Sequence, residues 1–231
     1  MSRGNAWQGV WTVLVFAFIL TPIASLVFFS FNADRFPSLP WGGFSLEWYR
    51  AIFADDTVRA GFWRSIQVSG FVAVVATFIG FATAYTDYRY NFRGKMPYLA
   101  IAALPPTVPV LILGLGMLSF FSMVNLVGTL RAVMFGHVVI CAPFAMALIR
   151  MRLADMSPDI EPAAWYLGAS RWATMWRATI PWCLPSIIAS FAITAAVSFD
   201  EFMLAWYVSG LEEPLPVRIL ALLQGQVGPR I

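Results

Sequence analysis

Charged side chains are scarce in this sequence of 231 residues. Asp, Glu, Lys and Arg together make up 12% of it, well below the roughly 25% typical of soluble domains, whereas hydrophobic residues make up 60%. A composition so poor in charge excludes an ordinary soluble domain. It predicts an all-α integral membrane protein, because helices satisfy their own backbone hydrogen bonds in lipid.

Thiol and imidazole groups are also few. Cys141 and Cys183 lie in or beside apolar runs, without a CxxC or Cys/His cluster, so we expect neither a disulfide nor a metal site. For the single histidine, His137, a satisfied hydrogen bond is favoured over a proton relay. Ser119 or Ser122 with His137 would be needed for intramembrane protease chemistry, and no motif supports that arrangement.

A phosphate-binding loop is missing. No GxxxxGK[ST] stretch occurs in the sequence, so the chain cannot bind and hydrolyse ATP by a Walker mechanism on its own. Gly80, Gly114 and Gly116 lie in apolar runs, where close helix packing accounts for them. We therefore expect no cofactor in this chain and no bond chemistry.

Long apolar runs, in contrast, are plentiful. About 20 helical residues cross the ~30 Å hydrocarbon layer of a bilayer. Although the first run resembles a signal peptide, its length, its internal Pro22 and the lack of a cleavage pattern before Asn32 favour a retained span. The five expected transmembrane helices lie near residues 7–31, 66–85, 98–124, 133–149 and 184–208.

The basic residues favour a cytoplasmic N-terminus, following the positive-inside rule. We expect one transmembrane domain over residues 1–231, with 32–65 as an extracytoplasmic segment and 151–182 as a cytoplasmic loop. The outer segment balances four Arg with four acidic residues. The basic residues on the inner side are Arg3, Arg89, Arg93, Lys95, Arg150, Arg152, Arg171 and Arg177.

The outer segment turns amphipathic at Ser45. The stretch from Ser45 to Glu47 resembles a helix N-cap. A packed loop helix is favoured over an interfacial helix, although the aromatic content would also suit the membrane interface. The aromatic residues concerned are Trp48, Tyr49, Phe53, Phe62 and Trp63.

Three prolines interrupt the third apolar run. Pro105, Pro106 and Pro109 cannot lie in one regular helix, because each lacks an N–H and clashes with the preceding turn. Broken helices persist in membranes where protein or a water-filled cavity satisfies the freed carbonyls. The pattern therefore indicates a transport pathway rather than an inert anchor.

The segment 151–182 contains start and stop signals for two short helices. We expect the first helix over residues 162–167, with a stop at Gly168. We expect Ser170 to cap a second helix that runs to about Thr179 and is ended by Pro181 and Pro185. Small residues here leave room for the surface of another protein, while Trp165, Trp172 and Trp176 suit either a partner or the membrane face. A docking element and a purely structural interfacial helix both remain open at this point.

The stretch "AAWYLGAS" contains Gly168, and nine residues separate this glycine from Ala178, which begins "ATIP". This arrangement resembles the coupling motif of ABC importer permeases. That motif is written EAA, three residues, G, nine residues, I-x-L-P. The resemblance implies that this loop inserts into a groove on an ATPase subunit and transmits its motion. Pro162 stands at the motif's Glu position and Glu161 lies one residue early, so the role of that Glu does not carry over. The implied coupling residues are Glu161, Pro162, Ala163, Ala164, Gly168, Ala169, Ser170 and Pro181.

Further stretches resemble the second permease of spermidine/putrescine importers. They are "YNFRGK", "HVVICAPFAMALIRMRL", "LPSI" and "SFDEF". Such permeases have six spans, so we expect either a truncated sequence or a missing last helix. The resemblance implies a polyamine as substrate, with an amino-acid derivative, an opine or a metal complex as alternatives. The broken third run alone also fits a different class, a stand-alone secondary transporter or channel subunit.

The same resemblance implies a set of partners in the bacterial inner membrane. These are a second permease forming a heterodimer, two copies of an ATPase that holds ATP and Mg, and an extracytoplasmic solute-binding protein. Nucleic acid is not among them. The permease pair would work by alternating access.

Two carboxylates lie inside the last apolar run. Asp200 and Glu201 are about 15 residues into it, where a lipid-facing carboxylate costs about 2.5–3.5 kcal/mol. We expect Asp200 to line the translocation path and attract a cationic amine. The alternative is that the acids pair with an Arg or cap an unwound turn of the partner subunit. The other residues expected on the path are Glu201, Phe199, Phe202, Trp206 and Tyr207.

Overall fold

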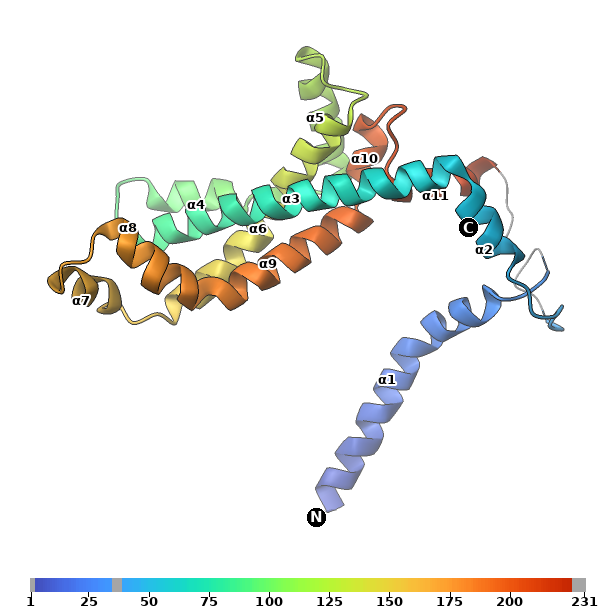
Figure 1. The fold of residues 1–231 in the computed structure, drawn as a ribbon, viewed down its shortest axis with the longest axis horizontal. Helices are drawn as coiled ribbons and strands as arrows, with labels where there is room; N and C mark the ends of the chain where they lie inside the picture. The colour runs from blue at the N-terminus through green and yellow to red at the C-terminus, as the bar shows by residue number, and fades with distance from the viewer. Residues whose placement is uncertain (1–2, 35–38, 226–231) are drawn as a thin grey trace. The chain divides into compact units, whose positions relative to one another are not determined.

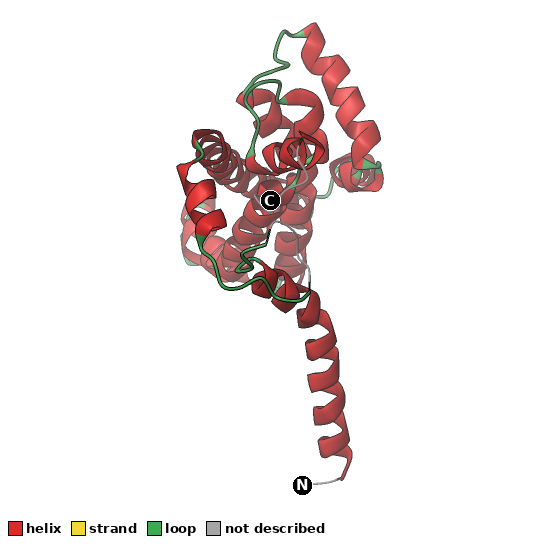
Figure 2. Ribbon diagram, turned by 90° about the vertical axis from the view of Figure 1, so that its right-hand side faces the viewer, coloured by secondary structure: helices red, strands yellow, loops and turns green. Residues whose placement is uncertain are grey.

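A computed structural model describes residues 3–34 and 39–225, and all regular elements in these ranges are helical (Figures 1 and 2). This confirms the all-α fold class. Apart from the helices, the described residues contain one isolated β-bridge, between Asn32 and Phe44. The helices are α1 (Arg3–Phe29), α2 (Glu47–Ala54), α3 (Asp56–Arg89), α4 (Lys95–Ala103), α5 (Val110–Met123), α6 (Leu130–Ala154), α7 (Ile160–Tyr166), α8 (Arg171–Thr174), α9 (Ile180–Asp200), α10 (Met203–Val208) and α11 (Leu215–Gly225).

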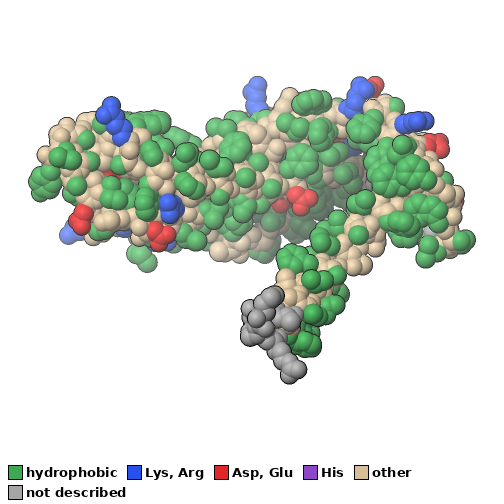
Figure 3. All heavy atoms as spheres, turned by 60° about the horizontal axis from the view of Figure 1, so that its bottom comes forward, with side chains coloured by type: hydrophobic (Ala, Val, Ile, Leu, Met, Phe, Trp, Pro, Cys, Tyr) green, Lys and Arg blue, Asp and Glu red, His purple; other side chains and the backbone are tan. Residues whose placement is uncertain are grey.

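Four helical stretches are long and apolar enough to cross a membrane. They are Trp7–Phe29, Asp56–Arg89, Leu130–Ala154 and Arg171–Asp200. Hydrophobic side chains accordingly dominate the surface in Figure 3, where charged groups are few and scattered. Of the five expected runs, the third forms no helix long enough to cross a membrane, and its longest helix is Val110–Met123. The expected sixth span would follow residues 226–231, which lie outside the described residues.

The chain divides into two compact units, and each is described by itself. One comprises the described parts of Met1–Arg59 and Ile219–Ile231, and the other is Ala60–Arg218. In the first, Asn32 is buried in the turn after α1, where its side-chain oxygen accepts hydrogen bonds from the N–H groups of Asp34 and Gly42.

The helix expected to start near Ser45 begins at Glu47, whose N–H donates to the Ser45 hydroxyl at 3.1 Å. It packs on the turn after α1 through two aromatic residues. Trp48 donates to the carbonyl of Asn32, and Tyr49 stacks on Phe31. Residues 35–38 of the expected outer segment 32–65 lie outside the described residues.

In the second unit, α6 packs along α9, and α3 approaches α6 closely. A side-chain carbon added at Gly80 of α3 would lie 2.6 Å from the Ala145 methyl of α6, so only glycine allows this crossing. Val72 and Ala76 of α3 and Val133 of α6 are completely buried in the core that results. Small and β-branched residues thus set the spacing of these helices.

The third apolar run is broken at its prolines, as predicted. Helix α4 ends at Ala103, Pro105–Thr107 form a 3-10 turn, and Pro109 lies at the N-cap of α5. Each proline occupies a place where no helical N–H is required. The run is therefore two helices joined by a tight connection.

Two expectations about the last run are wrong. The second helix of the 151–182 segment does not end at Pro181, because the helix continues from Arg171 to Asp200 through a π-helical turn at Met175–Thr179. The wide π turn changes the hydrogen-bond register just before Pro181. The missing N–H of this proline therefore breaks no regular helical hydrogen bond, and its ring does not clash with a tight preceding turn. The expected span 184–208 also ends early, because the helix breaks at Glu201.

Candidate functional site

The break between α9 and α10 separates the two carboxylates of the last run. Glu201 has extended backbone, and its side-chain oxygen accepts the Leu204 N–H at 3.0 Å, which caps the first turn of α10. Asp200, the last residue of α9, is exposed, and no described residue forms an ion pair or hydrogen bond with its carboxylate. One oxygen of Glu201 therefore holds the backbone of the break, whereas the Asp200 carboxylate has no partner among the described residues.

Helix α10 is held firmly in place by α5 and α6. Its Leu204, Ala205 and Val208 are completely buried. A side-chain carbon at Gly114 of α5 would lie 2.9 Å from the Tyr207 ring, and one at Gly136 of α6 would overlap the Leu204 side chain. The absence of side chains at these two glycines lets the short helix pack in.

The aromatic residues expected around Asp200 do not form one cage. Phe199 packs edge-on against Phe62 of α3, with ring centroids 6.1 Å apart. Tyr207 lies against Gly114, whereas Trp206 is exposed. Phe202 lies in the break itself, between Glu201 and α10. The structure thus brings these residues to one break but not around one point.

His137 joins α6 to the last turn of α9. It is buried, and its Nδ1 lies 3.0 Å from the Ser198 hydroxyl. The predicted hydrogen bond is confirmed at Nδ1, but the histidine is not fully satisfied, because its buried Nε2 has no hydrogen-bond partner among the described residues. The Ser198 partner was not foreseeable, because the two residues are 61 positions apart and no local pattern connects them.

The loop between α6 and α9 has the predicted joint. Helix α7 starts two residues earlier than expected, at Ile160, and ends at a Gly168 with φ of +86°. The N–H groups of Gly168 and Ala169 return to the carbonyls of Trp165 and Ala164, which closes the helix end. The Ser170 hydroxyl then accepts the Ala173 N–H at 3.2 Å and caps α8, as predicted.

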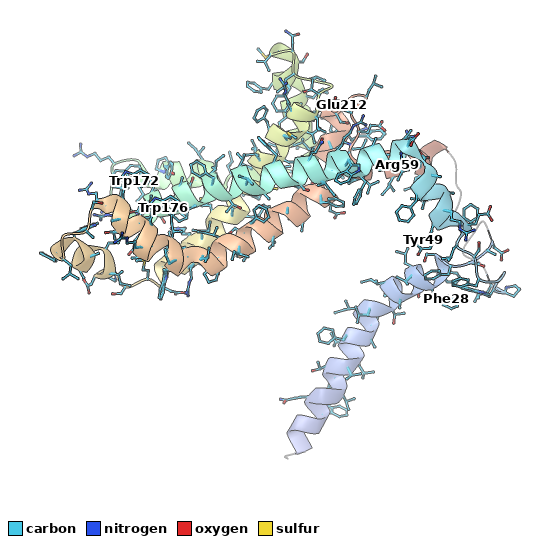
Figure 4. The ribbon with its side chains drawn as sticks, viewed as in Figure 1. Phe28, Tyr49, Arg59, Trp172, Trp176 and Glu212 are labelled. Carbon is cyan, nitrogen blue, oxygen red and sulfur yellow. The ribbon has the colours of Figure 1, made fainter. Side chains whose placement is uncertain are left out.

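Large apolar side chains cover the outside of this loop. Tyr166 is 93% exposed and Leu167 is 89% exposed. Trp172 and Trp176 are also exposed and project from α8 and the π turn (Figure 4). Trp165 is different, because the Arg89 guanidinium lies 4.4 Å from its ring centre. The loop therefore presents an uncovered apolar surface of the kind that marks interaction sites.

Glu161 points into the protein and not toward that surface. It is 2% exposed, and one carboxylate oxygen accepts the Thr179 hydroxyl at 2.8 Å and the Tyr85 hydroxyl at 3.3 Å. The other oxygen lies 3.2 Å from Nε of Arg89. The resemblance placed Glu161 in the coupling loop but predicted none of these contacts, because its partners lie on α3 and at the π turn.

A second ionic cluster joins the ends of α3, α4 and α6. Asp87 is buried, and its carboxylate pairs with Lys95 at 3.1 Å and with Arg150 at 2.5 Å. Lys95 also donates to the Asp87 carbonyl. Lys95 and Arg150, which the sequence placed only in a positive-inside count, thus share one buried carboxylate that the count did not include. Among the described residues, no cluster of His, Cys, Asp or Glu could hold a metal ion.

Known proteins resemble this chain over most of its length. The family described as binding-protein-dependent transport system inner membrane component matches residues 76–223. The spermidine/putrescine transport system permease protein PotC of Haemophilus influenzae is 32% identical over 94% of this chain and 85% of the relative. The putrescine transport system permease protein PotI of Escherichia coli is 28% identical over 98% of this chain and 83% of the relative.

A solved structure supports the fold independently. A bacterial ABC transporter involved in the import of the acidic polysaccharide alginate contains a chain that superposes with a TM-score of 0.74 at 19% identity. The match covers 96% of this chain and 81% of that chain. The chain therefore has the ABC importer permease fold and belongs to the family of binding-protein-dependent transport system inner membrane components, as a multi-pass inner membrane permease subunit rather than an enzyme.

Proposed function

We propose that this permease moves a small polyamine, such as spermidine or putrescine, into the cytoplasm by alternating access. The relatives named for spermidine and putrescine transport align with nearly the whole chain, which supports this substrate class. The fold alone does not define a substrate, because the alginate transporter shares it. The choice of a cation depends instead on the local chemistry of the break after α9.

The observation that carries the proposal is the exposed Asp200 carboxylate at the end of an apolar helix. A charge in such a helix is expensive unless water, protein or a ligand compensates it, and the described residues provide no cation beside it. A substrate ammonium group would neutralise the charge of Asp200 and would itself be attracted by this carboxylate. Glu201 is already engaged with the backbone of α10 and takes no direct part.

The partners of the complex form the second part of the proposal. The N-terminus faces the cytoplasm, and the α7–α8 loop docks into a separate ATPase through its exposed aromatic and aliphatic side chains. Two ATPase copies, which bind ATP and Mg, a second permease and an extracytoplasmic solute-binding protein complete the importer. Closure of the ATPases moves the loop, and the permease pair changes its affinity for the substrate between two states.

The test is uptake of labelled spermidine and putrescine by the complete complex carrying Asp200→Asn. Because this change removes the charge and keeps the size, we expect uptake to fall about tenfold while the complex still assembles. The matched control is Asp56→Asn, which removes an exposed carboxylate paired only with Arg59 and should leave uptake unchanged.

Unchanged uptake in Asp200→Asn would remove Asp200 from the pathway. Uptake that continues without any ATPase would instead indicate a stand-alone secondary transporter. Uptake of an amino-acid derivative, an opine or a metal complex in place of a polyamine would retain the permease role and overturn the substrate.

A further inference from the structure

We infer that Glu161 is a positioning residue that links the α7–α8 loop to the end of α3 and to the base of α9. Displacement of the loop then moves both long helices together. The inference rests on the proposed coupling function of this loop. It assigns Glu161 to the inside of the permease and not to contact with the ATPase.

The first step is the geometry of the Glu161 carboxylate. Its partners come from two different helices: Tyr85 and Arg89 lie in the last two turns of α3, and Thr179 ends the π turn before α9. Tyr85 is 76 positions away in sequence and Thr179 is 18 positions away. One buried side chain of α7 therefore connects this helix to both α3 and the π turn before α9.

The second step is the strength of this link. The side chain of Glu161 is 3% exposed, and that of Arg89 is 29% exposed. A buried carboxylate is stable only when it is paired and hydrogen-bonded, and removal of one partner leaves the other charge uncompensated. The link should therefore persist through the transport cycle, because its opening would leave a charge buried without a partner.

The third step is that α7 holds Arg89 twice. The guanidinium is paired with Glu161 and also lies 4.4 Å above the ring of Trp165, one turn further along the same helix. A flexible side chain such as Arg is ordered far better by two contacts than by one. Helix α7 and the end of α3 are thereby joined over a full helical turn.

The fourth step concerns the route to α9. The loop is connected to α9 through α8 and a π turn. The i to i+5 hydrogen bonds of a π turn interrupt the regular helix, so the helix can deform more easily there. The bond from Thr179 to Glu161 crosses this turn and fixes its last residue to α7. Without it, motion of α8 would be absorbed at the π turn before reaching α9.

The experiment uses the assembled complex and measures substrate transported per ATP hydrolysed. Glu161→Gln keeps the size of the side chain and removes its charge. We expect transport per ATP to fall about fivefold, while the ATPase still co-purifies, because the docking surface is untouched. The matched control, Arg93→Gln, removes an exposed charge from the nearby α3–α4 connection and should change neither quantity.

A distance measurement provides a readout that loss of stability alone would not move. Spin labels at Asp159→Cys, at the N-cap of α7 and outside the apolar docking surface, and at Tyr90→Cys report the separation of the loop from the end of α3, since both positions are exposed and the native Cys141 and Cys183 are buried. We expect one narrow distance distribution that is the same with and without ATP. Glu161→Gln should broaden it and make it depend on ATP.

Normal transport per ATP in Glu161→Gln, or a distance that already changes with ATP in the otherwise unaltered chain, would overturn the inference. If Glu161→Gln does not accumulate, the double variant E161Q/R89Q leaves no unpaired buried charge and should accumulate, with the same broadened distance. Failure of the unaltered chain to bind the ATPase would overturn the proposed function instead. The label pair in the chain alone would still test the link.

Discussion

Glu161 and Asp200 have the same chemistry and opposite surroundings. Glu161 is buried near one end of the second unit, with hydroxyl and guanidinium partners on three sides. Asp200 is exposed where α9 ends, and no described residue neutralises it. A carboxylate with a complete set of partners holds structure, whereas one without partners is free to bind. Under the proposed function, the first carboxylate belongs to the coupling loop and the second to the substrate pathway.

Removal of each carboxylate should give the sharpest contrast. Glu161→Ala leaves Arg89 and the Thr179 hydroxyl without their partner, so the free energy of unfolding should fall by about 2–3 kcal/mol. Asp200→Ala removes no described contact and should change it by less than about 0.5 kcal/mol. Denaturant unfolding in detergent micelles measures both. Equal losses would show that Asp200 also has a structural role.

The packing beside Asp200 can be tested with two neighbouring glycines of α5. Gly114→Ala places a methyl group 2.9 Å from the Tyr207 ring, which must shift, and we expect a loss of about 1–2 kcal/mol and slower uptake. Gly116→Ala meets no atom within 4 Å and should be neutral or stabilising, because Ala is the better helix former. If the two variants behave alike, close packing of α10 does not support the pathway.

Local signals predicted much of this fold. Long apolar runs, the three prolines of the third run, the Gly168 stop and the Ser170 cap each depend on a few adjacent residues, and the structure confirms them. Hydropathy alone could not show that the last helix would break at Glu201, since "FDEFMLAWYV" remains apolar on both sides. The break depends on a backbone hydrogen bond to the Glu201 side chain and on the burial of α10.

The candidate sites were harder to predict, because they depend on contacts between distant residues. The sequence predicted the joint within the 151–182 segment but not the partners of Glu161, since these lie on α3 and at the π turn. Continuation of the helix through Pro181 was missed for a similar reason. A π turn has no sequence signature that distinguishes Met175–Thr179 from an ordinary helix end.

The smallest predicted effect is at the joint of the loop, and it distinguishes the free chain from the assembled complex. Gly168 has a φ of +86°, yet no atom lies within 4 Å of where its side chain would begin. In the free chain, Gly168→Ala and Gly168→Trp should therefore cost about the same, about 1 kcal/mol, because the strain lies in the backbone and not in a clash. In the complex only the bulky residue should reduce transport per ATP, because it would occupy space between loop and ATPase. Denaturant unfolding of the free chain measures both losses. If Gly168→Trp lowers the free energy of unfolding more than Gly168→Ala does, the space beside Gly168 is filled by the permease itself and not by the ATPase.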